Sequence, residues 1–361
     1  MNLSKEILQV IAETGFTATT QVQADCIPVL LAGRDLIGQS KTGSGKTAAF
    51  VIPILQNTNI KNTQPQALIL CPTRELCDQV LKQAQLFSKY MRGFKIAQLI
   101  GGRPMAEQTQ ALAGGVHLIV GTPGRTLEHF KNRNFKTLNL KMVVLDEADR
   151  LLDDAFAEEI TAMMDLIPKN RQTIFFSATF PEIMNEISRK YQNNPERITI
   201  QETEDSKLQI EQYVYAAEKP QKMQTLIEIL KTHPSSCTLI FCRTKLAVNE
   251  VGKRLQQEKI TCEILHADLK QVDRDATTRA FRNGKLQVLV ATDVAARGID
   301  IDKLQLVVNF DLPSSPEIYI HRIGRTGRAG RKGLAVSIAT EYETELVAQI
   351  ESATGVKMVK K

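Results

Sequence analysis

The 361-residue sequence has no tryptophan and few aromatic residues, and none of its apolar runs approaches the length of a membrane-spanning helix. Since a spanning helix needs about 20 mostly apolar residues, a helical integral membrane protein is excluded. Aromatic residues make up 5% of the chain, which argues against a surface built from base-stacking platforms. The N-terminus carries Lys5 and Glu6 and has no long apolar segment, so it does not resemble a signal peptide. We therefore expect a cytoplasmic protein with no membrane partner.

Paired cysteine motifs and charged tails are also absent. The six cysteines include no Cys-x-x-Cys pair, and four of them lie in or beside apolar runs, as buried thiols do. We therefore expect neither structural zinc nor a disulfide framework. The net charge of +6 is divided evenly between residues 1–200 and 201–361. Such a mild excess is compatible with nucleic-acid binding and with many ordinary enzymes.

The chain does contain a regular series of short β-branched segments separated by segments of helical periodicity. Apolar strands that alternate with helices predict an α/β protein in which helices cover both faces of parallel sheets. The predicted strands are Asp35–Gly38, Ala67–Cys71, Ile96–Ile100, His117–Gly121, Met142–Leu145, Thr173–Phe176, Tyr213–Ala217, Thr238–Cys242, Thr261–Leu265, Gln287–Ala291, Leu306–Phe310 and Leu334–Ile338.

The length of the chain predicts two domains. Residues Gln201–Lys207 are polar and lack apolar periodicity, so we place a linker at 204–210, between domains 1–203 and 211–361. In open parallel sheets, ligands bind outside the carboxyl ends of the strands. Two such domains on a short linker are therefore expected to share one ligand-binding cleft.

The segment Ser40–Thr47 is rich in glycine, follows the first predicted strand and precedes a helical segment. This context is typical of a phosphate-binding loop, in which backbone N–H groups surround phosphates at a helix N-terminus. We expect Lys46 to reach the β- and γ-phosphates and Thr47 to hold Mg²⁺. Ser40 stands where the first glycine is usual. A glycine-rich turn without a ligand is the alternative, but it does not account for Gly-Lys-Thr in register after a strand.

Asp146-Glu147-Ala148-Asp149 directly follows the predicted strand Met142–Leu145. Taken alone, four such residues are more typical of a loop or a helix N-cap. They come about 100 residues after a phosphate-binding loop in the same predicted domain, which favours a metal-holding role. Asp146 is then expected to hold Mg²⁺ through water, and Glu147 to orient and deprotonate the attacking water.

Together these segments resemble the DEAD-box RNA helicases, whose name is spelled by Asp146–Asp149. The other matching segments, in the family's order, are Gln23 within Thr19–Gln23, Pro72–Leu76, Gly101-Gly102, Thr122–Arg125, Ser177–Thr179, Gln271-x-x-Arg274, Ala291–Asp300 and His321–Arg328. The resemblance covers almost the whole chain and implies two tandem RecA-like domains, with ATP and Mg²⁺ as cofactors and RNA as partner. Lys41 and the run Ala67–Val80 most resemble the DbpA subfamily of bacterial ribosomal-RNA helicases, without its C-terminal RNA-binding domain.

The resemblance also implies how ATP is held. Gln23 would recognise adenine, because its amide both donates and accepts hydrogen bonds, and Phe16 would stack on the ring. Asp300 would bind the ribose hydroxyls. The other residues assigned to the nucleotide are Thr42, Gly43, Ser44, Gly45, Lys46, Thr47 and Gly298.

Arg325 and Arg328 belong to the second domain, so the resemblance brings them to the triphosphate only when the domains close. There they would act with Lys46, Asp146 and Glu147 as the catalytic set, since an arginine fork stays charged and binds phosphate oxygens in pairs. A solvated basic loop is the alternative for Arg322–Arg331. Coupling between the domains is assigned to Asp149, Ser177, Thr179 and His321.

The expected RNA contacts are short hydroxyl side chains, glycine amides and a few arginines, which suit a sugar–phosphate backbone and carry no base code. They are Thr73, Arg74, Gly102, Thr122, Gly124 and Arg125 in the first domain, and Arg243, Gln271, Arg274 and Thr292 in the second. Such a site can prefer RNA through its 2′-hydroxyl while ignoring sequence.

The sequence thus predicts a monomeric, RNA-stimulated ATPase that opens short duplexes or remodels RNA–protein particles, with ribosomal RNA or pre-ribosomal particles among its partners and ribosome assembly as a possible setting. An RNA clamp or annealing module with slow turnover is the alternative, although Glu147 and both arginines favour the enzyme. A DNA-directed helicase on the same architecture is a second alternative. A small-metabolite kinase would leave the second-domain motifs without a role.

Overall fold

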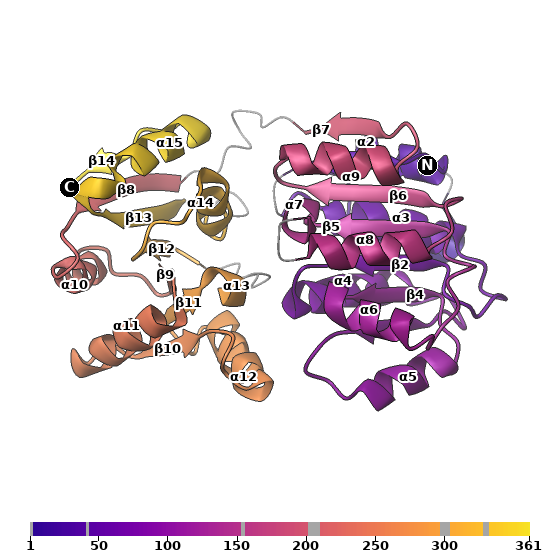
Figure 1. The fold of residues 1–361 in the computed structure, drawn as a ribbon, viewed down its shortest axis with the longest axis horizontal. Coiled ribbons are helices and arrows are strands. Elements are labelled where there is room, and N and C mark those ends of the chain that lie inside the picture. The colour runs from indigo at the N-terminus through magenta and orange to yellow at the C-terminus, as the bar shows by residue number, and fades with distance from the viewer. Residues whose placement is uncertain (1–2, 41–42, 153–155, 201–209, 297–303, 328–331) are drawn as a thin grey trace. The chain divides into compact units, whose positions relative to one another are not determined.

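The computed structural model describes residues 3–40, 43–152, 156–200, 210–296, 304–327 and 332–361. The chain divides into two compact units, Met1–Gln201 and Glu202–Lys361, which Figure 1 shows from indigo to pink and from pink to yellow. The predicted linker at 204–210 lies almost wholly outside the described residues, so its limits stay a prediction.

The first unit is built on one sheet of seven strands in the order β3-β4-β2-β5-β6-β1-β7. Every neighbouring pair is parallel. The strands are β1 (Leu36–Gln39), β2 (Ala67–Leu70), β3 (Ile96–Leu99), β4 (Leu118–Gly121), β5 (Met142–Asp146), β6 (Gln172–Ser177) and β7 (Glu196–Thr199).

The second unit repeats this plan with a seven-stranded parallel sheet in the order β10-β11-β9-β12-β13-β8-β14. Numbered from the first strand of each unit, the two orders are identical. The strands are β8 (Ile210–Ala216), β9 (Thr238–Cys242), β10 (Cys262–Leu265), β11 (Val288–Thr292), β12 (Leu306–Asn309), β13 (Gly333–Ala339) and β14 (Val359–Lys360). The predicted fold class, two parallel α/β sheets, is confirmed.

All twelve predicted strands are present, with ends that shift by up to three residues, but two edge strands were not predicted. β7 reads Glu-Arg-Ile-Thr and alternates between half-buried and exposed positions, and both residues of β14 are exposed. Neither has the apolar run of a central strand. An edge strand that pairs on one side needs no such run.

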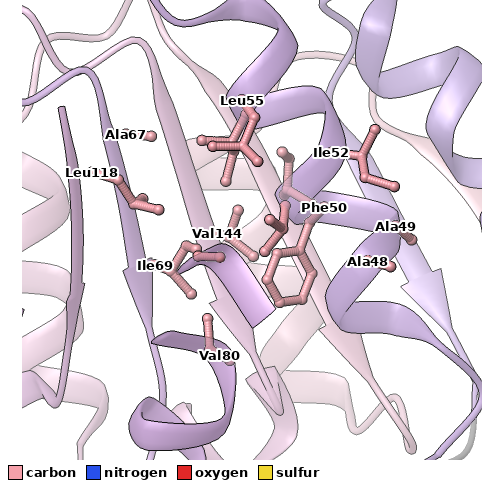
Figure 2. Packing of buried hydrophobic residues seen from close by; sticks show 14 of the residues in the cluster. Ala48, Ala49, Phe50, Ile52, Leu55, Ala67, Ile69, Val80, Leu118 and Val144 are labelled. Atoms are coloured by element: carbon pink, nitrogen blue, oxygen red, sulfur yellow. The ribbon is translucent and has the colours of Figure 1, made fainter. Parts of the chain in front are cut away.

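Helices cover both faces of the first sheet because successive strand residues point to opposite sides. In β2, Ala67 and Ile69 pack with α1–α4, as Figure 2 shows for Ile69 beside Phe50 of α3, whereas Leu68 and Leu70 pack with α5–α9. The helices are α1 (Lys5–Glu13), α2 (Gln21–Leu31), α3 (Lys46–Asn57), α4 (Arg74–Phe87), α5 (Met105–Ala113), α6 (Pro123–Lys131), α7 (Ala148–Leu151), α8 (Ala157–Leu166) and α9 (Glu182–Tyr191).

The second sheet is covered in the same way. Its helices are α10 (Lys222–Thr232), α11 (Lys245–Gln257), α12 (Gln271–Arg282), α13 (Asp293–Ala296), α14 (Pro316–Ile323) and α15 (Thr344–Thr354), with a 3₁₀ turn η2 (Glu341–Glu343). The helices α10 and α11 pack on one face, and α12–α15 pack on the other. All six cysteines are buried and carry free thiols. Within the described part of the chain, no helix has the length and apolar character needed to cross a bilayer.

Asp35 fastens the start of β1 to two neighbouring segments. Its buried carboxylate accepts hydrogen bonds from the backbone N–H groups of Thr173 at 2.8 Å and Asn193 at 2.6 Å. Burial raises the pKa of Asp35 despite these bonds. The carboxylate is therefore a buried acceptor that joins the start of β1 to the start of β6 and to the segment before β7.

Replacing Asp35 with alanine is expected to lower the free energy of unfolding by about 3 kcal/mol, because each unsatisfied buried N–H costs roughly 1–3 kcal/mol. Urea denaturation followed by circular dichroism measures this change. The control is Glu186→Ala, which removes an exposed carboxylate. A loss for Asp35→Ala no larger than for the control would contradict the anchoring role.

Candidate functional site at the carboxyl edge of each sheet

Apart from Phe16 and Gln23, which precede β1, the predicted site residues of the first unit lie at or after the carboxyl ends of six strands. The segments after β1, β5 and β6, which are neighbours in the sheet, carry the phosphate-binding loop, the acidic segment and Ser177–Thr179. The segments after β3, β4 and β2 carry the predicted RNA residues. Because all strands run parallel, these segments share one edge, with the nucleotide residues on one half of it and the RNA residues on the other.

The phosphate-binding loop turns through two glycines. Gly43 and Gly45 have φ of +81° and +95°, a left-handed region that side chains rarely adopt. Gly45 is also crowded, since a Cβ there would lie 2.6 Å from Nε2 of Gln23. The loop leads into α3, whose first residue is Lys46. Thr42 lies outside the described residues.

Lys46 is buried beside the acidic segment. Its Nζ donates to the carbonyl of Ser40 at 2.5 Å, and burial lowers its pKa, while the carboxylates of Asp146, Glu147 and Asp149 oppose that shift. Burial raises the pKa of Asp146 to about 7, and the charge of Glu147 adds to this rise. Three carboxylates around one amine leave the site short of positive charge.

This donor set fits Mg²⁺. The metal prefers oxygen ligands and commonly takes one or two carboxylates together with substrate phosphates. Asp146 supplies a buried carboxylate at the end of β5, and Thr47 supplies a hydroxyl in the first turn of α3. A divalent cation here would favour the ionised form of Asp146, which burial alone disfavours.

Glu147 has an unusual backbone conformation. It precedes α7 with φ +52° and ψ +54°, in the left-handed region, and its N–H donates to Oδ1 of Asp146 at 3.1 Å. A non-glycine residue in this region costs on the order of 1 kcal/mol or more, and such residues cluster at functional sites. Arg133, Asn194 and Lys259 share a positive φ, but Glu147 is the one of these four that lies in the acidic segment.

Asp149, Ser177 and Thr179 form one hydrogen-bonded group. Oδ2 of Asp149 accepts from the N–H of Thr179 at 3.0 Å and from its hydroxyl at 2.6 Å. The hydroxyl of Ser177 accepts from the N–H of Asp149 at 3.3 Å and donates to the carbonyl of Thr179 at 2.6 Å. The acidic segment after β5 is therefore tied to the segment after β6, while their predicted coupling to the second unit stays a prediction.

Gln23 holds the phosphate-binding loop in addition to its predicted adenine contact. Its Nε2 donates to the carbonyl of Gly45 at 3.2 Å, and its Oε1 accepts from the N–H of Thr20 at 3.1 Å. The spacing Thr20-x-x-Gln23 is that of a capping box, a signal that could have revealed the second bond. Phe16 is 54% exposed and stacks on Phe87, so its outer face is open to a ligand.

The predicted RNA residues of the first unit are mostly held by local contacts. Thr73 caps α4 by accepting from the N–H of Leu76 at 3.2 Å, and Thr122 precedes Gly124 in the first turn of α6. The guanidinium of Arg74 lies against Gly101 and Gly102, since a Cβ on Gly102 would be 2.5 Å from its Nη1.

Arg125, on α6, is also held by contacts within its own unit. It donates to the carbonyl of Arg103 at 2.8 Å and pairs with Glu128 at 3.1 Å. The arginines of this half are therefore positioned before any ligand arrives.

The predicted RNA residues of the second unit occupy equivalent positions. Arg243 follows β9, Gln271 and Arg274 lie on α12 after β10, and Thr292 ends β11. Since β10, β11 and β9 match β3, β4 and β2 in sheet order, the same half of each sheet edge carries these residues. The side chain of Arg243 is 60% exposed.

The arginine-rich segment of the second unit is not a solvated loop where the structure describes it. Arg322 is 2% exposed and makes a two-pronged ion pair with Asp293 at 2.6 and 2.7 Å. It also donates to Asn309 at 3.0 Å and to the carbonyl of Asp311 at 2.7 Å. Arg325 is 8% exposed and lies two residues after the end of α14, the helix that carries His321. Gly298, Asp300 and Arg328 lie outside the described residues.

Two family models match the chain, one in each unit. Residues 20–187 match the model described as DEAD/DEAH box helicase, and residues 221–330 match the helicase conserved C-terminal domain. The "DEAD-box ATP-dependent RNA helicase CshA" of Geobacillus kaustophilus is 40% identical over 358 residues, which are 99% of this chain and 76% of that protein. The "ATP-dependent RNA helicase DeaD" of Buchnera aphidicola subsp. Acyrthosiphon pisum is 44% identical over 97% of this chain and 58% of its own length.

Solved structures are also similar to this chain over almost its whole length. Saccharomyces cerevisiae Dbp5 bound to RNA and ADP BeF₃ matches with a TM-score of 0.88 at 31% identity, over 100% of this chain and 94% of that one. Mss116p bound to single-stranded RNA and AMP-PNP matches with a TM-score of 0.89 at 27% identity, over 99% and 77%. The chain belongs to the DEAD-box family of ATP-dependent RNA helicases.

Proposed function

We propose that the chain binds Mg²⁺·ATP at the β1–β5–β6 half of the first sheet edge, binds an RNA backbone at the other half, and hydrolyses ATP only when both are bound. Each cycle then opens a short duplex or releases a bound partner. The single observation that carries this proposal is the placement of Lys46, Asp146 and Glu147 on neighbouring strand ends, beside the arginine-bearing ends of β2, β3 and β4.

Each residue has a distinct role in this proposal. Bound Mg²⁺ would neutralise charge on the transferred phosphoryl group. Lys46 lies at the N-terminus of α3, where an amine and backbone N–H groups attract phosphate. Glu147, next to Asp146, would orient a water and take its proton. Arg325 would add positive charge from the second unit in the transition state, with Arg328 beside it.

The same site supports a narrower assignment for the partner. RNA is proposed as the ligand because Dbp5 and Mss116p, both similar to this chain, were solved with RNA. Binding to ribosomal RNA or pre-ribosomal particles, membership of the DbpA subfamily, a monomeric state and a cytoplasmic location stay predictions from the sequence. The relatives described above carry the names CshA and DeaD instead.

Replacing Glu147 with glutamine tests the proposed chemistry. The side chain keeps its size but cannot accept a proton, and general-base catalysis commonly contributes about 10²–10⁴-fold. RNA-stimulated ATPase is expected to fall at least 100-fold, while a filter-binding assay shows long-lived RNA retention with ATP.

Glu158→Gln, which changes an exposed glutamate of α8, serves as the matched control and should leave both readouts unchanged. If retention falls together with ATPase in Glu147→Gln, Glu147 is a structural residue. If wild-type chain retains RNA with ATP but shows no ATPase and no strand displacement, the chain is a clamp.

A further inference from the structure

The second unit contains a groove of which the predicted site includes only one lining residue, Arg243. It encloses about 1030 Å³ and lies between the N-terminal end of α10 and one side of α11, both labelled in Figure 1. Ala247, Val251 and Arg254 line it at helical spacing, so the groove follows α11 for about two turns. Its end at the sheet edge is formed by Arg243 and Thr244 after β9 and by Asp311 after β12.

The charges that line the groove favour an anion. Five cationic and three acidic side chains contribute to it. Two of the acids form ion pairs with the buried amine of Lys222, which lies 3.5 Å from Asp311 and 3.8 Å from Glu343. Glu343 also pairs with Arg243 at 3.5 Å. The third acid, Glu250, lies on the exposed side of α11.

The remaining cations face solvent. Lys219, Lys253 and Arg254 are exposed, and no ion pair joins them to another residue in the described part of the chain. Lysines and arginines that are exposed and not engaged with protein carboxylates can neutralise phosphates at little cost in lost contacts.

An aromatic side chain stands at the same groove. Tyr342, in η2, is 92% exposed and lines the groove beside these cations. A tyrosine this exposed contributes nothing to the core, whereas its ring can stack on a base. Aromatic stacking combined with a basic groove is how proteins bind single strands without reading their sequence.

We infer that this groove holds single-stranded RNA that continues beyond the RNA contacts of the core, with Lys219, Lys253 and Arg254 on phosphates and Tyr342 on a base. The inference rests on the proposed function, because Arg243 is both a proposed core contact and the end of the groove. Continuity with Arg243 and the charge of the lining favour RNA over other anions.

The test compares two RNAs on the full chain with Mg²⁺ and AMP-PNP. One RNA has about 8 nucleotides and the other about 24. Single-strand binding folds cover roughly 4–16 nucleotides, so only the longer RNA is expected to reach the groove as well as the core contacts. The double variant Lys253→Gln/Arg254→Gln is expected to bind the long RNA about 10-fold more weakly. Its log–log salt slope should be smaller by about 1.4, since each single-strand phosphate contributes about 0.7. Binding of the short RNA should not change.

Tyr342→Ala should weaken binding of the long RNA about 5-fold or more, without a change in salt slope, because stacking is not a charge effect. The matched control is Lys231→Gln/Lys285→Gln, which removes two exposed lysines of the same unit outside the groove. Thermal melting should be the same for all variants.

Three results would overturn the inference: no loss with the long RNA, an equal loss with both RNAs, or displacement of the long RNA by polyglutamate as effectively as by competitor RNA. The last result would assign the groove to an acidic protein segment. Failure of the wild-type chain to bind the short RNA would instead contradict the proposed function, so the two failures are distinguishable.

Discussion

Replacing Lys46 with alanine is expected to abolish RNA-stimulated ATP hydrolysis. The amine is the positive charge of a loop whose glycines and helix N-terminus are shaped for phosphate. In the structure it donates to the Ser40 carbonyl, and the carboxylates of Asp146, Glu147 and Asp149 favour its charged form. Without this amine, the carboxylates would repel the phosphates, because Lys46 would no longer balance their negative charge. Steady-state ATPase with saturating RNA is the measurement.

Lys82→Ala, which removes an exposed lysine of α4, is the control for loss of charge. Because Lys46 is buried, Lys46→Met is measured as well, since it keeps the aliphatic part of the side chain in place. Circular dichroism shows whether each variant is folded. A folded variant that retains more than a tenth of wild-type activity would refute the assignment of the phosphate-binding loop.

Replacing Arg325 with alanine is expected to lower RNA-stimulated turnover about 10³-fold or more, which corresponds to roughly 4 kcal/mol of barrier. Phosphate binding is assigned to the first unit and transition-state charge to the second. Nucleotide affinity without RNA should therefore change little, because that arginine is needed only when RNA favours a closed form. Turnover and ATP affinity are measured separately on the full chain.

Arg282→Ala, an exposed arginine at the end of α12, is the matched control. Arg322→Ala is not suitable, since Arg322 is buried in an ion pair with Asp293 and its loss would disturb the fold. If Arg325→Ala loses ATP affinity and turnover in parallel without RNA, the residue supports the fold of α14 and not the transition state.

Much of the fold could be predicted because the central strands are buried on both faces. Such strands are short apolar runs, and the loops that follow them carry glycine, lysine or acidic residues at their carboxyl ends. The placement of Lys46 after β1 and of Asp146 at the end of β5 follows from that pattern alone. This pattern involves only neighbouring residues, so it can be recognised in the sequence without knowledge of how the chain packs.

The features that could not be predicted depend on contacts between distant segments. β7 pairs with β1 across about 160 residues of chain and is too polar to be recognised by itself. The bond from Gln23 to Gly45 joins α2 to a loop 22 residues away. Arg322 looks like one member of a basic run, and only its contacts with Asp293 and Asn309 show that it is buried.

Because the two sheets have the same strand order, a position in one unit can be compared with the matching position in the other. Lys46 is the first residue of the helix after β1, and Lys222 is the first residue of the helix after β8, so the two amines occupy the same place in a repeated plan. Asp146 is likewise the last residue of β5, and Asp311 lies two residues after the matching strand β12. In the second unit, however, the segment between β8 and α10 contains no glycine. The amine of Lys222 donates to the Phe310 carbonyl at 3.1 Å and lies near two carboxylates. The position of the amine that is predicted to bind phosphate in the first unit is therefore occupied in the second unit by a buried lysine whose contacts are with neighbouring segments of its own unit.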